Sequence, residues 1–252
     1  MIAWWVASAM AAPPRCTEVG LRDVTDLTPP AIVVLGERHG TQPDLRRAWR
    51  AVRKLHRSGP VTLALEAVHT SHQPTLDRYA AGEVTLYDLP YALDWETSWG
   101  FPWIPYRPLV AASRRGVQVV AAGPTLGPAP QDAKFPVPPG YFSILSDAMA
   151  GHPVPPTFQD RFVRSMAWRD HSIAEAAINA WSGEGFLVVV TGRGHVEGGK
   201  GVNWQLSRRG EAKVYSAVLA EGEEAPCYPG DRIWTFDPIR DLGLETWLRS
   251  TD

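Results

Sequence analysis

The stretch that decides the fold is Ala31-Ile-Val-Val-Leu-Gly-Glu-Arg-His39, in which an apolar run meets a glycine and then charged side chains. The pattern returns at Phe186-Leu-Val-Val-Val-Thr-Gly-Arg-Gly-His195, and a third apolar run, Val61-Thr-Leu-Ala-Leu65, ends on Glu66. Short β-branched runs of this kind are typical of parallel strands that helices cover on both faces. The sequence therefore predicts an α/β fold with a mostly parallel central sheet flanked by helices.

The stretches between these strands have apolar residues at helical spacing, which predicts helices there. Leu45, Ala48, Val52 and Leu55 share one side of a helix over 42–57, which Ser58-Gly59-Pro60 ends. Further strands are expected at 117–122, 214–219 and 233–236, and further helices at 71–81, 106–115, 157–181 and 202–207. Residues 123–139, rich in proline and glycine, predict an irregular insertion over the carboxyl ends of the strands.

The length of 252 residues and the continuous pattern predict a single α/β domain over 13–252. The apolar opening, residues 1–12, ends in small residues and contains Ala9-Met10-Ala11, a form typical of a signal-peptidase site, which favours export to the periplasm or cell envelope. If the chain is exported, Cys16 and Cys227 are expected to form a disulfide; if not, they are free thiols. No other stretch approaches the roughly 20 apolar residues of a membrane span.

The composition gives no sign of a nucleic-acid partner, because the formal net charge is −2. A serine or cysteine hydrolase is poorly supported as well, since the sequence has no Gly-x-Ser-x-Gly elbow. The eleven tryptophans are unusual. Most of them will serve core packing, although a site for a flat aromatic ligand uses the same residues.

Two histidines and two glutamates follow the predicted strands. His39 and His195 each come after a strand and a glycine, and Glu37 and Glu66 end strands that are otherwise apolar. Parallel strands present their carboxyl ends at one edge of the sheet, where α/β proteins bind ligands, so we expect these four side chains to converge. They can hold a divalent transition metal or act in acid–base catalysis, and the alternative for the glutamates is a structural ion pair.

Arg169 and Asp170 belong to the predicted helix over 157–181. If that helix crosses above the sheet edge, both side chains can face the site, and an arginine there suits a carboxylate or a propionate because its guanidinium donates two parallel hydrogen bonds. A surface ion pair is the alternative.

Several motifs together resemble the ChaN-like family of bacterial haem-binding or iron-uptake proteins, within the superfamily of the Tiki metalloproteases and erythromycin esterases. They include Leu35-Gly-Glu-Arg-His39, Trp95-x-x-x-Trp-Gly100, Tyr106-x-Pro-Leu109 and Gly192-x-Gly-His-x-x-Gly-x-x-Gly-Val202, and the resemblance covers about 31–207. It implies an α/β fold with a site at the strand ends. It also implies a shared polar constellation at Glu37, His39, Glu66, Arg169, Asp170 and His195.

The favoured function under this resemblance is a haem- or iron-binding cell-envelope protein that holds its ligand at the carboxyl edge of the sheet. Aromatic residues such as Trp99 would contact the porphyrin, and Arg169 or Arg107 would pair with a propionate. Tyr106, Tyr79 and Tyr91 are the candidate axial ligands, and a homodimer can close over a flat ligand.

The alternative function is a metal-dependent hydrolase, either a peptidase or an esterase. His39 and His195 with Glu37 or Glu66 would hold the metal, and the other carboxylate would act as general base. A metal-free version would use His39 as the base, with Glu66 orienting it. A scaffold without chemistry is the third interpretation, and it does not explain the paired Gly-x-x-His ends.

Overall fold

The computed structural model describes residues 16–124, 129–130, 134–148, 155–210, 212–221 and 227–236. The predicted signal peptide at 1–12 and parts of the predicted insertion at 123–139 lie outside these ranges.

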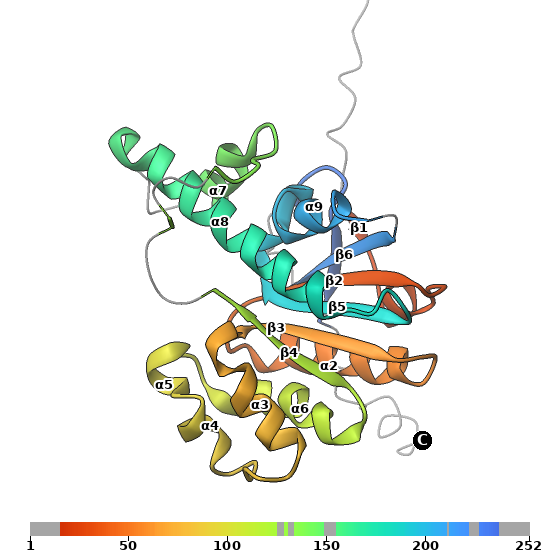
Figure 1. The fold of residues 1–252 in the computed structure, drawn as a ribbon. Helices are drawn as coiled ribbons and strands as arrows, with labels where there is room; N and C mark the ends of the chain where they lie inside the picture. The colour runs from red at the N-terminus through yellow and green to blue at the C-terminus, as the bar shows by residue number, and fades with distance from the viewer. Residues whose placement is uncertain are drawn as a thin grey trace, which may run out of the picture.

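A single all-parallel sheet of seven strands organises the described chain, in the order β1-β7-β6-β2-β5-β3-β4 (Figure 1). The strands are β1 (Thr17–Glu18), β2 (Ala31–Glu37), β3 (Val61–His69), β4 (Gln118–Gly123), β5 (Phe186–Gly192), β6 (Lys213–Ala220) and β7 (Arg232–Thr235). Strands β2, β3 and β5 are buried along their whole length, as their apolar runs require. The predicted α/β fold with a parallel central sheet is confirmed.

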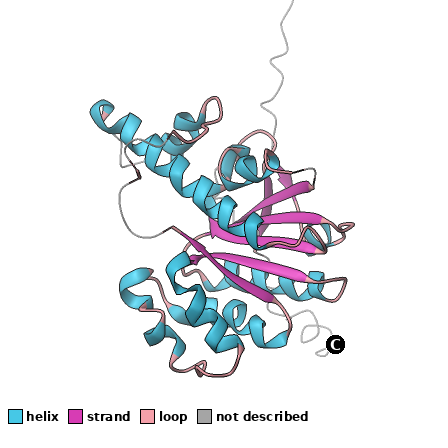
Figure 2. Cartoon of the chain, viewed as in Figure 1, coloured by secondary structure: helices cyan, strands magenta, loops and turns pink. Residues whose placement is uncertain are grey.

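Helices cover both faces of the sheet (Figures 1 and 2). They are α1 (Leu21–Thr25), α2 (Gln42–His56), α3 (Gln73–Ala80), α4 (Leu89–Ala92), α5 (Trp95–Ser98), α6 (Trp103–Val110), α7 (Tyr141–Ala148), α8 (Pro156–Ala180) and α9 (Val202–Ser207). The helix predicted over 106–115 begins earlier, at Trp103, and ends as a 3₁₀ turn over Ala111–Arg115. The shortest helices were not predicted, because one turn carries no apolar period.

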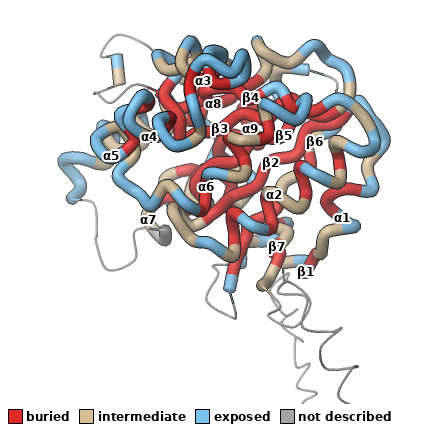
Figure 3. The backbone as a smooth tube through the Cα atoms, turned by 90° about the horizontal axis from the view of Figure 1, so that it is seen from below, coloured by how far each residue is buried: buried red, intermediate tan, exposed pale blue. Residues whose placement is uncertain are grey.

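The alternation of side chains along each strand assigns these helices to the two faces. Val33 and Leu35 pack in one core with Leu45 of α2 and with α6. Ile32 and Val34 face the other way and pack with Ile173 of α8 and with α9. In Figure 3 the strands of the sheet are coloured as buried over most of their length.

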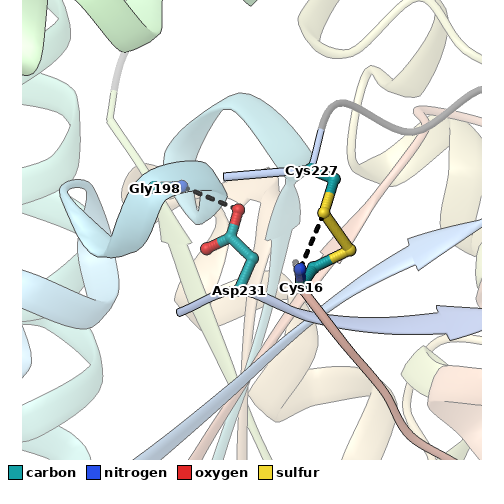
Figure 4. Close-up of a disulfide and its surroundings, with 4 residues drawn as sticks. All are labelled: Cys16, Gly198, Cys227 and Asp231. Atoms are coloured by element: carbon teal, nitrogen blue, oxygen red, sulfur yellow. Dashed lines mark hydrogen bonds between the residues drawn. A yellow bond between two sulfur atoms is a disulfide. The ribbon is translucent and has the colours of Figure 1, made fainter. Parts of the chain in front are cut away.

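The two cysteines form a disulfide between the start of β1 and the segment before β7 (Figure 4). Strand β1 has only two residues, so this bond holds the edge of the sheet together. Asp231, close to the disulfide in sequence, accepts a hydrogen bond of 3.0 Å from the backbone N–H of Gly198. The disulfide region therefore contacts the glycine-rich loop that follows β5.

A fully buried arginine, Arg47 of α2, joins the ends of two strands to the first turn of its own helix. Its guanidinium donates to the carbonyl oxygens of Ala220 (2.8 Å) and Trp234, at the ends of β6 and β7, and to Asp44 (2.6 Å). Asp44 also accepts the backbone N–H of Arg38 at 3.0 Å and its guanidinium. This network fixes the loop that leads from β2 to His39.

Replacing Arg47 with methionine removes the donors while keeping most of the side-chain volume. We expect the free energy of unfolding to fall by about 3–5 kcal/mol, because Asp44 is then a buried carboxylate that has lost a cation. Urea denaturation measures the change. The matched control is Arg46→Met at the neighbouring exposed position, for which we expect a change within about 0.5 kcal/mol. Equal stabilities of the two variants would contradict this role.

Candidate functional site

The first of two hydrogen-bonded groups at the carboxyl edge of the sheet centres on Glu37, the last residue of β2. Its Oε1 lies 2.6 Å from His39 Nδ1 and accepts the Tyr106 hydroxyl at 3.0 Å. The Tyr106 oxygen in turn accepts the Gly40 N–H at 3.0 Å, which brings α6 over the end of β2. Glu37 is buried, whereas 28% of the His39 side chain is exposed. The His39 ring is thus held by a buried carboxylate at Nδ1 and is partly open to solvent.

Aromatic side chains form a wall beside His39. The Trp99 ring meets the imidazole edge-on with centroids 4.6 Å apart, and the Phe101 ring lies 4.9 Å away. Both residues lie in the segment that connects α5 to α6. The predicted residue Trp99 is therefore next to the predicted histidine.

The second group centres on the buried carboxylate of Glu66 in β3. Its Oε2 accepts the Thr191 hydroxyl at 2.6 Å and the Gly192 N–H at 2.8 Å. Its Oε1 accepts the Arg169 guanidinium at 2.9 Å and lies 3.3 Å from His195 Nε2. All the positions of this carboxylate that can accept are occupied by donors from β5, α8 and the loop after β5.

Asp170 completes the second group from the far side of His195. Its Oδ1 lies 2.6 Å from His195 Nδ1, and its Oδ2 accepts the hydroxyl of Tyr141 from α7. His195 is consequently bracketed by two carboxylates, one on each ring nitrogen.

Gly192 lies between the two groups. A Cβ atom at this position would come within 2.9 Å of His39 Nε2 and 3.7 Å of Glu66 Oε2. Because only glycine leaves this space, the open ring of His39 can approach the Glu66 group closely. The contacts described above join the six residues that were predicted to converge at one edge, namely Glu37, His39, Glu66, Arg169, Asp170 and His195. Their functional roles stay predictions.

The electrostatics separate the roles of the two histidines. Burial lowers the pKa of His195, but the charges of Glu66 and Asp170 outweigh it and raise this pKa to about 10. Burial opposes the charge of Glu66 too, yet His195 holds the pKa of this carboxyl well below its ordinary value. His195 and Glu66 therefore form an ion pair at neutral pH.

The pKa shifts in the first group, around Glu37 and His39, have opposing causes. Burial lowers the pKa of His39, while the hydrogen bond to Glu37 and the charge of Glu66 raise it above its ordinary value overall. Burial raises the pKa of Glu37 and likewise that of Asp170.

Most of the atoms that the predicted metal centre of His39, His195, Glu37 and Glu66 would use already have partners in this structure. Both ring nitrogens of His195 already face carboxylates, and both oxygens of Glu66 already accept hydrogen bonds. Among the described residues, no group of three or more His, Cys, Asp or Glu side chains is arranged to hold a metal ion. His39 Nε2 is the ring nitrogen of the site that has no carboxylate against it.

The three candidate tyrosines lie in different places. Tyr106 is part of the first group, Tyr79 is buried in the core, and Tyr91 is 77% exposed on α4. Arg107 lines a cleft with Tyr91 that shares no lining residue with the sheet edge. Burial raises the pKa of Tyr106 far above its ordinary value, so its hydroxyl stays protonated.

Sequence reasoning missed Thr191, Tyr141 and Phe101. Thr191 is the one hydroxyl in the run Phe186–Gly192, and this could have marked it. Tyr141 follows the proline-rich segment, where nothing in the pattern indicates which strand end it will reach.

The sequence comparison identifies a family. A family model described as haem-binding uptake, Tiki superfamily, ChaN matches residues 24–206. The chain belongs to this family. A search of curated proteins finds no match. None of the helices in the described ranges is long and apolar enough to cross a membrane.

Solved structures share the fold of this ChaN-family chain. The structure titled "Cofacial heme binding to ChaN of Campylobacter jejuni" matches with a TM-score of 0.62 and 17% identity, covering 77% of this chain and 83% of that one. The Vibrio vulnificus MARTX toxin effector domain RRSP matches with a TM-score of 0.52 and 16% identity, covering 87% of this chain and 39% of that one. The type III effector HopBA1 matches with a TM-score of 0.51 and 14% identity, covering 92% of this chain and 99% of that one. Identities this low establish the fold alone.

The His195 ion pair predicts a dependence of stability on pH. A pKa raised from 6.5 to about 10 contributes stability that is complete below the lower value and is lost as the pH rises through the higher one. The difference in unfolding free energy between wild type and His195→Gln should therefore shrink between these two pH values. Urea denaturation across this range measures it, and a constant difference would contradict the ion pair.

Proposed function

We propose that this ChaN-family protein binds haem at the carboxyl edge of the sheet, over the open ring of His39. The observation that carries the proposal is the state of this ring: Nδ1 is held by Glu37 at 2.6 Å, while Nε2 has no carboxylate against it and the side chain is 28% exposed. Histidines that ligate metals generally use one ring nitrogen and give the other to a carboxylate or carbonyl. Bound haem would supply an iron for one nitrogen ligand.

The surroundings of His39 support a porphyrin more than a small ion. Trp99 and Phe101 offer aromatic surface beside the ring, and Arg169, 26% exposed, offers a guanidinium for a propionate. Among the candidate tyrosines, Tyr106 is a poor axial ligand because its protonated hydroxyl donates to Glu37. His39 is thus the best-placed donor at this edge.

The disulfide between Cys16 and Cys227 supports action outside the reducing cytoplasm, in the periplasm or cell envelope. The proposed role is haem binding during uptake, as the family description indicates. A homodimer that closes two flat ligands against each other agrees with the cofacial haem named for the Campylobacter protein.

Haemin titration followed by Soret absorbance tests the site. Wild type should show saturable binding, and His39→Ala should weaken it by at least about tenfold, because the nitrogen ligand is lost. Tyr91→Phe is the matched control on the outer surface and should bind as wild type does. Unchanged binding by His39→Ala, or loss of binding in Tyr91→Phe, would reject the edge as the haem site.

The second candidate function is metal-free hydrolysis of an ester or a peptide. The short contact from Glu37 to His39 Nδ1 favours it, because a carboxylate in this position orients the ring and stabilises the imidazolium that forms when Nε2 takes a proton from water. Here Glu37, rather than the expected Glu66, contacts the base. Arg169, whose side chain is 26% exposed, would stabilise negative charge on the attacked carbonyl oxygen.

A panel of chromogenic esters and unstructured peptides tests this candidate. If His39 is the base, Glu37→Gln should reduce any activity by about 10²–10⁴-fold, with the haem affinity measured in parallel. Arg46→Gln, at an exposed position of α2 outside the site, serves as the control. Activity that survives in His39→Ala would exclude this mechanism.

A further inference from the structure

A concave surface separate from the sheet edge lies on helices α4 and α6. This aromatic cleft has a volume of about 260 Å³, and its lining includes Tyr87, Pro90, Tyr91, Trp103, Ile104 and Arg107. None of the residues assigned to the sheet-edge site lines it. The proposed haem site leaves the aromatic cleft without a role.

Several large side chains of this cleft are exposed to solvent. Tyr87 is 79% exposed, Tyr91 77% and Ile104 62%. The Tyr87 and Tyr91 rings lie with centroids 6.4 Å apart. Scattered exposed apolar residues need no explanation, but a group of them around one cleft marks a binding surface.

Every polar side chain of the cleft can donate a hydrogen bond, and the two tyrosine hydroxyls can also accept one. Within the described ranges, the Tyr87 and Tyr91 hydroxyls, the Trp103 indole N–H and the Arg107 guanidinium make no hydrogen bond or ion pair. A ligand that satisfies them has to offer acceptors, an anionic group and flat apolar rings. Donors of its own are not required, because the Trp103 and Arg107 side chains only donate.

We infer that the aromatic cleft binds a proline-rich peptide segment that carries an acidic residue. A polyproline II helix makes no internal hydrogen bonds and leaves its carbonyl oxygens free, and proline has no N–H. The carbonyl oxygens accept from the tyrosine and tryptophan donors, the pyrrolidine rings pack on the aromatic surfaces, and the acidic side chain pairs with Arg107. Aromatic-lined grooves recognise such peptides because little conformational entropy is lost on binding.

The backbone around the cleft suits a preformed site. Pro90 lies in the first turn of α4, and α6 contains Pro105 and Pro108, which restrict the backbone on both sides of the cleft. The buried side chains of Leu89 and Leu109 attach these helices to the main core. Binding therefore requires little rearrangement of the protein.

Fluorescence anisotropy with a labelled peptide of proline pairs separated by leucine and glutamate tests the inference on the full chain. We expect saturable binding that weakens by about tenfold or more in Tyr91→Ala. Arg107→Glu should lose the glutamate peptide and bind the counterpart in which lysine replaces glutamate. Phe158→Ala, an exposed residue on α8, should leave binding unchanged.

Three results would overturn the inference. These are the absence of binding, equal affinity for a peptide with alanine in place of proline, and competition by haemin together with loss of haem binding in Tyr91→Ala. The last result would assign the cleft to haem. His39→Ala is predicted to weaken haem binding and to leave peptide binding unchanged. A failure of the peptide-binding experiment therefore does not decide whether haem binds at the sheet edge.

Discussion

The buried carboxylate of Glu66 is the constraint on which the carboxyl edge of the sheet depends. Removing an ionised carboxylate from water costs several kcal/mol unless donors surround it. Here those donors come from β5, from α8 and from the loop after β5, through Thr191, Gly192, Arg169 and His195. Helix α8 and that loop must therefore occupy the positions they have, or the charge in β3 is left without partners.

This constraint gives the two histidines different roles, although their sequence settings look alike. His195 is enclosed between Glu66 and Asp170 and is 8% exposed, so its charge serves the stability of the edge. His39 contacts a single carboxylate and reaches the surface beside Trp99. His39 is consequently the histidine of this edge that solvent can reach.

The sequence was sufficient to predict the parallel sheet and to predict that the site residues lie close together at one edge of it. Apolar runs such as Ala31–Leu35 can only be buried strands, and parallel strands bring their ends together, so Glu37, Glu66 and His195 were expected close to one another. The pairing of carboxylates with ring nitrogens could not be predicted in this way. It depends on where α7 and α8 cross the edge, and that crossing is fixed by packing on the sheet rather than by any local pattern.

The same distinction applies to the metal ion expected from two histidines and two glutamates, which stays a prediction. Residue type and spacing describe which atoms can ligate, but the neighbouring donors and acceptors decide which lone pairs are still available. Thr191 and Gly192 occupy one oxygen of Glu66, and Arg169 and His195 occupy the other. The remaining ring nitrogen, His39 Nε2, is the one that the proposed haem site would use as its nitrogen ligand. The proposed haem site therefore depends on which lone pairs are still available at this edge, and a count of donor residues does not give that information.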